Sequence, residues 1–337
     1  MRVRQIIAKL RLRQLALLGV SVLFALFVAE IALRLFAPLY QANDPAAYIY
    51  DAELGCRLRD GFYSVQTTDF QQEIRANQRG YVNYQEDFAA YPKLIFAVGD
   101  SYTQGTGLPV DAAYPLQLDL LLNQDDKGLY APRYGIVNLG IGSYGGEQEL
   151  VLLQRATQQM RPPDVILYLG CDNDYEDDRL FLSGYRHRHL VEGSPYWGRW
   201  VRPLRWLTND LQLGIRAKLA FGAMRRQQIL RQASAGNETV APSVAEREAG
   251  VLERLAAYAQ AHNSLLIVSW ANQTDSYDWL QNWAAQRQIP FADWRVRVKA
   301  AQANLPALPT HNPHSGGHHR VWVNRLIAEE FARHIAR

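Results

Sequence analysis

From about residue 92 onward, short apolar runs alternate with longer segments in which apolar residues recur at helical spacing. Four runs read as buried strands, at residues 94–98, 136–139, 165–169 and 265–270, and a weaker fifth lies at 290–292. The helical segments cover residues 115–123, 146–160, 244–261, 276–287 and 320–335. Strands that alternate with helices pair in parallel and carry helices on both faces of the sheet. The pattern predicts a three-layer α/β/α sandwich with a mainly parallel sheet.

Two segments do not follow this alternation of predicted strands and helices. Residues 39–92 are rich in Tyr, Gln, Asp and Gly and contain short alternating stretches, which predict a small collar of strands and turns. Residues 180–243 carry aromatic and basic clusters and one helical stretch near 211–232. We interpret this second segment as an insertion in a domain of residues 93–337, serving as a lid, as a membrane-surface contact or as a simple insertion.

The N-terminal segment combines positive charge with a long apolar run. Five basic residues and no acidic one occur in residues 1–14, and residues 15–36 are long enough to cross a bilayer as a helix. Glu30 and Arg34 interrupt the run near one end, where an i,i+4 pair can form. We predict an uncleaved anchor over residues 15–38, with residues 1–14 in the cytoplasm and the remainder on the extracytoplasmic, periplasmic side. A cleaved signal peptide and a buried amphipathic helix are the alternatives.

Charge and cysteine content narrow the classes of partner. The chain has 36 basic and 33 acidic residues, of which 30 basic and 32 acidic residues lie beyond residue 38. The part beyond residue 38 therefore has no excess of positive charge, and we do not expect nucleic acid as a partner. The two cysteines, Cys56 and Cys171, could be free thiols or form one disulfide in an extracytoplasmic compartment.

The first predicted catalytic residue is Ser101, which follows the strand at 94–98 directly in the sequence Gly-Asp-Ser-Tyr-Thr. Parallel sheets bind ligands at the carboxyl ends of their strands, and a serine there is placed for nucleophilic attack. The segment is not a Gly-x-Ser-x-Gly elbow, because Thr103 stands where the second glycine would be. A turn serine without a chemical role is the alternative interpretation.

Three further segments strengthen the catalytic interpretation. The stretch GDSYTQGTG resembles the first block of the SGNH (GDSL-type) hydrolases, in which this serine is the nucleophile. Residues 138–146 resemble the second block, with Gly142 or Ser143 as a main-chain oxyanion donor, and Gly170-Cys-Asp-Asn173-Asp174 resembles the third, with Asn173 as a side-chain donor. The resemblance spans roughly residues 94–335. It implies a flavodoxin-like fold and ester hydrolysis through an acyl-enzyme, without metal or organic cofactor.

The last block of the family contains a histidine preceded at two or three residues by an aspartate. His314 is the predicted match to the base, but Asn312 and His311 stand where the acid is expected. Asn312 can orient an imidazole by hydrogen bonding, although it cannot supply a full charge. A Ser–His dyad assisted by a distant residue such as Asp293 is the more cautious prediction, and His311 is a competing base.

Other features admit less specific interpretations. The four histidines at 311, 314, 318 and 319 could bind a metal, but no nearby carboxylate or cysteine completes a set, so we predict no metal site. A solvated acidic loop or a cation site is the alternative for residues 172–178. Trp197, Trp200 and Trp206 could rest on lipid headgroups or a glycan, or pack in a core.

The sequence therefore predicts serine-dependent hydrolysis of a carboxylic ester, with a lipid or an acylated glycan as possible substrate classes. Two alternatives stay open. The same residues could transfer or remove O-acyl groups on an envelope polysaccharide, or the chain could be a catalytically inactive, membrane-tethered binding protein. The absence of the expected aspartate favours the inactive alternative.

Overall fold

The computed structural model describes residues 2–39, 47–66, 70–125, 127–184, 193–194, 207, 210–233, 243–305, 308–312 and 317–335. Contacts divide the chain into two compact units. One consists of Met1–Gln41 and Gly198–Arg225, and the other of Ala42–Trp197 and Arg226–Arg337. The second unit contains the sheet and the predicted site.

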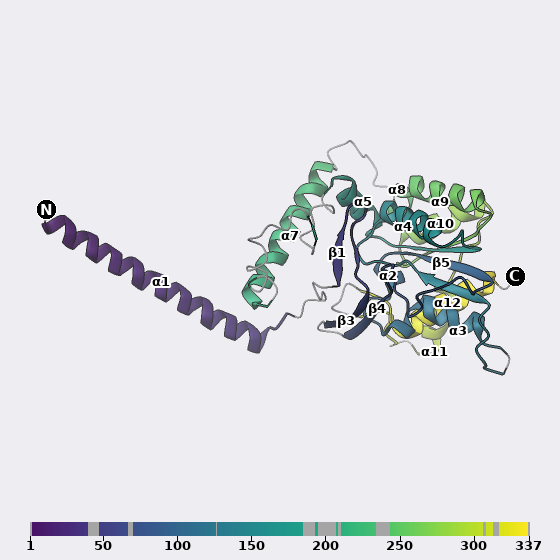
Figure 1. The fold of residues 1–337 in the computed structure, drawn as a ribbon, viewed down its shortest axis with the longest axis horizontal. Coiled ribbons are helices and arrows are strands. Elements are labelled where there is room, and N and C mark those ends of the chain that lie inside the picture. The colour runs from purple at the N-terminus through teal and green to yellow at the C-terminus, as the bar shows by residue number, and fades with distance from the viewer. Residues whose placement is uncertain are drawn as a thin grey trace. The chain divides into compact units, whose positions relative to one another are not determined.

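The central sheet has four parallel strands in the order β6-β5-β7-β8 (Figure 1). Their bounds are β5 Lys93–Gly99, β6 Tyr134–Asn138, β7 Val165–Gly170 and β8 Leu265–Trp270. Every residue of β7 is buried, as expected for a strand covered on both faces. The predicted run at 290–292 adds only an isolated parallel bridge between Val268 and Phe291.

Helices cover both faces of this sheet. In Figure 1, α4 and α9 lie on one face and α3 and α12 on the other, and α12 packs directly against α3. The described helices of this unit are α2 Ser101–Gln104, the 3-10 helix η1 Val110–Ala112, α3 Tyr114–Asn123, α4 Gly146–Gln159, α5 Asp174–Leu182, α8 Val244–Arg247, α9 Ala249–Ala261, α10 Asp275–Gln286, α11 Arg295–Asn304 and α12 Val321–Ile335. The predicted three-layer sandwich is confirmed, whereas α5 and α11 were not predicted.

The region before the sheet forms two antiparallel strand pairs. The first joins β1 Tyr48–Asp51 to β2 Gly55–Leu58, and the second joins β3 Gly61–Gln66 to β4 Gln71–Ala76. A small apolar cluster that includes Leu58, Ile74 and Val110 packs this region against η1. The collar residues therefore share a compact unit with the sheet.

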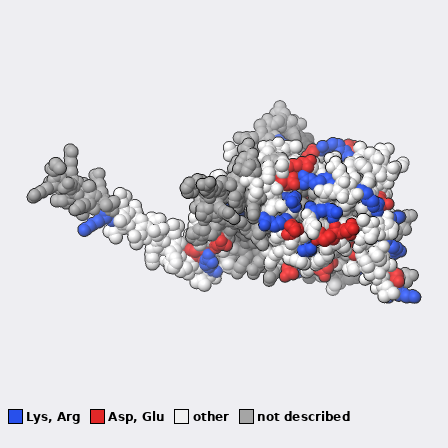
Figure 2. Space-filling model, in the orientation of Figure 1, with Lys and Arg blue, Asp and Glu red and all other residues white. Residues whose placement is uncertain are grey.

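The other unit contains the long helix α1 Arg2–Phe36 and the part of helix α7 Gln212–Ala233 that ends at Arg225. Within α1, Arg13–Phe36 is long and apolar enough to cross a membrane, and only 6% of its most apolar window is buried. Space-filling Figure 2 shows basic and acidic residues interspersed over the visible face of the sheet-containing unit, as its near-neutral composition predicts. Cys56 and Cys171 do not form a disulfide with each other.

Candidate active site

Ser101 is the first residue of α2, immediately beyond the end of β5. The side chain of Asp100 caps this short helix by accepting a hydrogen bond from the Tyr102 N–H at 2.9 Å. Because β5 lies between β6 and β7, the serine is placed where the loops from both neighbouring strands can reach it. This is the edge of a parallel sheet at which ligands bind.

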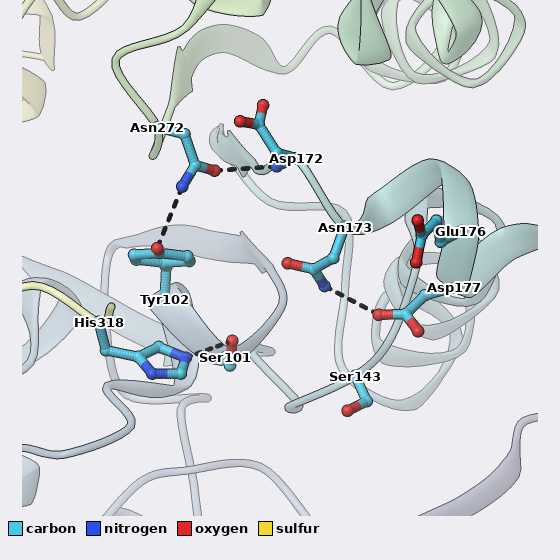
Figure 3. Close-up of a pocket in the computed structure, with 9 residues that line it drawn as sticks. All are labelled: Ser101, Tyr102, Ser143, Asp172, Asn173, Glu176, Asp177, Asn272 and His318. Carbon is cyan, nitrogen blue, oxygen red and sulfur yellow. Dashed lines mark hydrogen bonds between the residues drawn. The ribbon is translucent and has the colours of Figure 1, made fainter. Parts of the chain in front are cut away.

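The Ser101 hydroxyl lies between an imidazole and a carboxyl group. Its Oγ is 2.8 Å from Nε2 of His318 and 2.9 Å from Oδ2 of Asp100, and Figure 3 shows the contact with the imidazole. One hydroxyl hydrogen can be donated to only one of these acceptors. Donation to an unprotonated Nε2 is the arrangement that activates a serine nucleophile.

The imidazole that contacts Ser101 is thus four residues beyond the predicted base. His314 lies outside the described residues, and His318 had been considered only as a member of a histidine-rich metal motif. A short antiparallel pairing positions His318, because its carbonyl accepts the Asn312 N–H at 2.9 Å and His311 pairs with His319. Its ring lies 5.0 Å from that of Tyr102, centroid to centroid.

The other residues suggested near the base have different surroundings. Asn312 contacts His318 through its backbone, while its side chain borders a separate cavity of about 690 Å³. His311 Nδ1 lies 2.6 Å from the Thr310 hydroxyl. The carboxylate of Asp293 accepts hydrogen bonds from Tyr277 and Gln281, at 2.8 and 3.3 Å, rather than from an imidazole.

The loop after β6 approaches Ser101 closely. A Cβ built on Gly142 would lie 3.6 Å from the Ser101 Cβ, and one built on Gly140 would lie 2.2 Å from the Gln104 nitrogen. Gly140 therefore has no room for a side chain. The Gly142 N–H donates to the Gln104 side-chain oxygen, whereas the Ser143 N–H has no partner among the described residues. Ser143 has a φ of 67°, a conformation that favours glycine.

Asn173 stands at the start of α5, in the loop after β7. Its Nδ2 donates to Asp177 at 2.8 Å and lies 3.3 Å from Asp100 Oδ2, which itself contacts the serine hydroxyl. Figure 3 shows Asn173 and Asp177 on the opposite side of the site from His318. The structure therefore brings the predicted Ser101, Ser143 and Asn173 to one cavity, together with the unpredicted His318.

This cavity has a volume of about 530 Å³ and is lined almost entirely by polar side chains. Three carboxylic acids contribute to it, Asp172, Glu176 and Asp177. Asp172 is fixed by the Trp270 indole N–H at 2.8 Å and the Thr274 hydroxyl at 3.0 Å. Its lining residues are Ser101, Tyr102, Ser143, Asp172, Asn173, Glu176, Asp177, Asn272 and His318.

A second group of carboxylic acids is buried behind the site, on α4, α5 and the start of α9. Burial, followed by repulsion from Glu248, raises the pKa of Asp178 to about 9. Burial and repulsion from Asp174 raise the pKa of Glu248 to about 7. Burial also raises the pKa of Asp174 and of Glu149 well above the usual range, and neither oxygen of Glu149 has a hydrogen-bond partner among the described residues. We call Glu149, Asp174, Asp178 and Glu248 the carboxyl cluster.

On the other side, His319 is buried among aromatic rings. Its ring lies 4.9 Å from the rings of Tyr102 and Trp294 and 4.8 Å from that of His311. Burial lowers the pKa of His319 well below its usual value and lowers that of His311 as well. Both imidazoles are therefore held in the neutral form.

Among the described residues, one group of three side chains could bring metal-ligand atoms together. The ligand atoms of Asp100, Cys171 and Asp174 lie within 4.8 Å of one another. The Cys171 sulfur is, however, 3.0 Å from Asp174 Oδ1, and burial raises the pKa of its thiol well above the usual value. Because a metal requires the thiolate, these contacts favour a hydrogen-bonded core over a metal centre.

No family model matches the chain, and no curated protein matches it. Among solved structures, a member of the lipolytic G-D-S-L family from Veillonella parvula is 12% identical, with 72% of this chain and 98% of that chain covered and a TM-score of 0.41. A GDSL-like lipase from Bacteroides thetaiotaomicron is 12% identical over 73% and 88% of the two chains, with a TM-score of 0.34. An alpha/beta hydrolase enzyme from the metagenome of Lake Arreo, Spain, is 15% identical over 72% and 95%, with a TM-score of 0.39. These values are too low to transfer an activity, which has to be inferred from the chain's own residues.

Proposed function

We propose that this chain is a serine esterase in which Ser101 is the nucleophile and His318 the general base. The observation that carries the proposal is the 2.8 Å separation of Ser101 Oγ and His318 Nε2 at the carboxyl end of the sheet. A nucleophile and a base within hydrogen-bond reach at the mouth of a cavity are the minimum arrangement for acyl transfer.

The reaction follows from these two groups. Ser101 Oγ attacks the ester carbonyl while His318 Nε2 takes the hydroxyl proton, giving a tetrahedral intermediate and an imidazolium. The imidazolium then protonates the leaving alcohol, and the acyl group stays on Ser101. Water, deprotonated by His318, attacks the acyl-enzyme and releases the acid, which returns both residues to their starting state.

The oxyanion of the intermediate needs N–H donors close to Ser101. We assign this role to the backbone N–H groups of Ser101 and Ser143 and to the Asn173 amide. Gly142, the other predicted donor, is engaged by Gln104, so Ser143 fits the role better. Asn173 must give up part of its contact with Asp177 to reach an oxyanion, a tightening that occurs in many active sites when substrate binds.

The acid of a complete triad has no counterpart at the expected spacing. Ser315 and Gly316 occupy the positions three and two residues before His318, and neither carries a charge. Asn312 acts through its backbone instead, because its N–H fixes the His318 carbonyl. The proposal therefore concerns the pair Ser101 and His318, whose imidazole is positioned by the antiparallel pairing of residues 311–312 with 318–319 and by the Tyr102 ring.

The lining of the cavity favours a small acyl group and a polar alcohol. Among the nine described lining residues, Tyr102 is the only one with an aromatic carbon ring, and none is aliphatic, as binding of a long hydrocarbon chain would require. The carboxylic acids Asp172, Glu176 and Asp177 disfavour anionic substrates. Removal or transfer of an O-acetyl group on a glycan is therefore the second candidate function, using the same dyad with a sugar oxygen as leaving group or acceptor.

Turnover of p-nitrophenyl acetate and octanoate by the full chain tests the proposal. We expect the acetate to be hydrolysed faster, and a fluorophosphonate probe to label the wild-type chain but not Ser101→Ala. Ser64→Ala changes an exposed serine of β3 and serves as the matched control. Equal labelling of the Ser101 and Ser64 variants would remove Ser101 from the role, and an unlabelled wild-type chain would favour the inactive binding protein.

We further propose that α1 remains attached as a membrane anchor and that the site faces the extracytoplasmic side. Near its end, Glu30 contacts the start of α7 and Arg34 contacts Asp210 just before that helix, so cleavage after the apolar run would remove part of the folded protein. Resistance of the chain to carbonate extraction, together with an N-terminus that begins at or near Met1, is expected. A soluble chain starting beyond residue 36 would overturn this assignment.

A further inference from the structure

The end of α1 is hydrogen-bonded to the beginning of α7. The Glu30 carboxylate accepts the backbone N–H groups of Gln212 and Leu213, at 2.9 and 3.0 Å. The first N–H groups of a helix have no acceptor inside the helix, and a negative charge there complements the helix dipole. An acidic residue of α1 therefore serves as the N-terminal cap of α7.

Further contacts hold the same junction. Arg34 is paired with Glu30 at 2.7 Å and donates to the Asp210 carbonyl at 2.7 Å. The Gln212 side chain accepts the Leu39 N–H at 2.8 Å and donates to the Leu39 carbonyl at 3.0 Å. Because Leu39 follows the last residue of α1, Phe36, by three residues, α7 begins beside the end of the apolar helix.

The exposed side chains of α7 suit an interface between water and lipid. Phe221 and Met224 are 63% and 62% exposed and lie three residues apart, on one face of the helix. Ile215, nine residues before Met224 and hence on the opposite face, is 3% exposed. Lys218 borders the exposed face at i−3 from Phe221. Residues 212–225 contain three basic residues and no acidic one.

We propose that α7 is a second membrane contact, which lies on an anionic phospholipid leaflet with Phe221 and Met224 entering the interface. This inference rests on the proposed anchoring, since an apolar helix that leaves the bilayer at Phe36 places the beginning of α7 at headgroup level. Basic side chains beside exposed apolar ones are the composition of helices that lie in an anionic membrane surface.

Photo-crosslinking of the full chain tests this contact. p-Benzoyl-phenylalanine is placed at position 221 in one variant. In a control variant it replaces Val296, which lies on α11 and is 61% exposed. Both variants are reconstituted into phosphatidylcholine vesicles, with or without phosphatidylglycerol. We expect lipid adducts at 221, several-fold more with phosphatidylglycerol, and several-fold fewer at 296. The double substitution Lys218→Gln and Arg225→Gln should bring the yield at 221 down to that in phosphatidylcholine alone.

The outcomes separate this inference from the anchoring itself. The contact of α7 would be overturned, and the anchor left in place, if chains that resist carbonate extraction gave no lipid adduct at 221. An adduct yield that does not depend on phosphatidylglycerol would have the same consequence. Crosslinking of position 221 to protein would assign the exposed face to a protein partner and overturn the proposal in the same way. Chains released by carbonate would overturn the anchor and the α7 contact together.

Discussion

Ser101 lies between two polar regions whose protonation equilibria are shifted in opposite directions. On the His318 side, burial lowers the pKa of His319 and His311, which keeps both imidazoles neutral. On the other side, burial raises the pKa of the carboxyl cluster, which favours its protonated form. Both shifts reduce the charge that these two regions carry.

The two regions differ in whether a side chain from them contacts the Ser101 hydroxyl. The imidazole region reaches the serine hydroxyl directly through His318, whereas the carboxyl cluster lies behind the site. A charge pair that develops between an oxyanion and an imidazolium interacts most strongly where few other charges and little water compete. We therefore expect changes on the imidazole side to affect turnover and changes in the cluster to affect stability.

The largest expected effect is that of His318→Ala. Removing the base should lower kcat/KM for p-nitrophenyl acetate by at least about a thousandfold, which corresponds to about 4 kcal/mol of transition-state stabilisation. His314→Ala, the matched change at the histidine that the sequence favoured, should stay within a few-fold of the wild type. If His314→Ala abolished turnover and His318→Ala did not, the dyad would be assigned wrongly.

Asn173→Ala should have the next largest effect. Loss of one oxyanion donor lowers kcat by roughly 100- to 1000-fold, with little change in KM because the contact strengthens in the transition state. Asn272→Ala is the control, since this residue lines the same cavity but donates to the Tyr102 hydroxyl at 3.1 Å. A comparable loss in both variants would indicate a general effect on the cavity rather than oxyanion binding.

The sequence allowed the strand-end residues to be predicted and left the base undetermined. Ser101, Ser143 and Asn173 each follow a buried apolar run, and parallel strands bring their carboxyl ends to one edge. The proposed base, His318, lies in a segment with four histidines in nine residues and no periodicity. Which imidazole reaches the serine depends on the pairing of His311 with His319, a tertiary feature without a local signal.

The same limit applies to the charges in the apolar N-terminal segment. Their spacing predicted the pair between Glu30 and Arg34, which is confirmed. Nothing near them in the sequence indicated that Glu30 would cap a helix starting at Gln212, because that contact joins residues 182 positions apart. The carboxyl cluster was likewise unpredicted, since its members come from separate segments and only burial changes their chemistry.

His319→Phe should change how the free energy of unfolding depends on pH below neutrality. A histidine whose folded pKa lies below its unfolded value of about 6.5 must be neutral to fold, so its contribution is complete above that pH and is lost as the pH falls below it. We expect the variant to lose less of its free energy of unfolding between pH 6.5 and 5 than the wild type, in urea titrations. An unchanged difference between the two pH values would contradict the burial of a neutral imidazole.

Asp178→Asn should give the smallest effect, which is a change in how the free energy of unfolding depends on pH above neutrality. The folded protein keeps protons on Asp178 up to a pKa of about 9 and on Glu248 up to about 7, whereas the unfolded chain releases both near pH 4. The contribution of these two groups to the free energy of unfolding therefore falls as the pH rises from about 4 through their folded pKa values. At pH values about one unit or more above 6.5, where unfolded histidine is almost entirely neutral, this fall is separable from the contribution of His319.

In the Asp178→Asn variant, the amide oxygen can still accept the Glu147 N–H, a 2.8 Å contact in the wild-type chain, while one proton no longer titrates. Between pH 6.5 and 9, the free energy of unfolding of the variant should fall less than that of the wild type, by an amount on the order of 1 kcal/mol. The difference is smaller than the shift in pKa alone implies, because the protein relaxes and water enters around a buried charge. Asp60→Asn, at an exposed position, should leave the slope unchanged. If turnover of p-nitrophenyl acetate fell in Asp178→Asn as far as it does in Asn173→Ala, the cluster would belong to the catalytic machinery, and the division between a reactive and a structural side of Ser101 would fail.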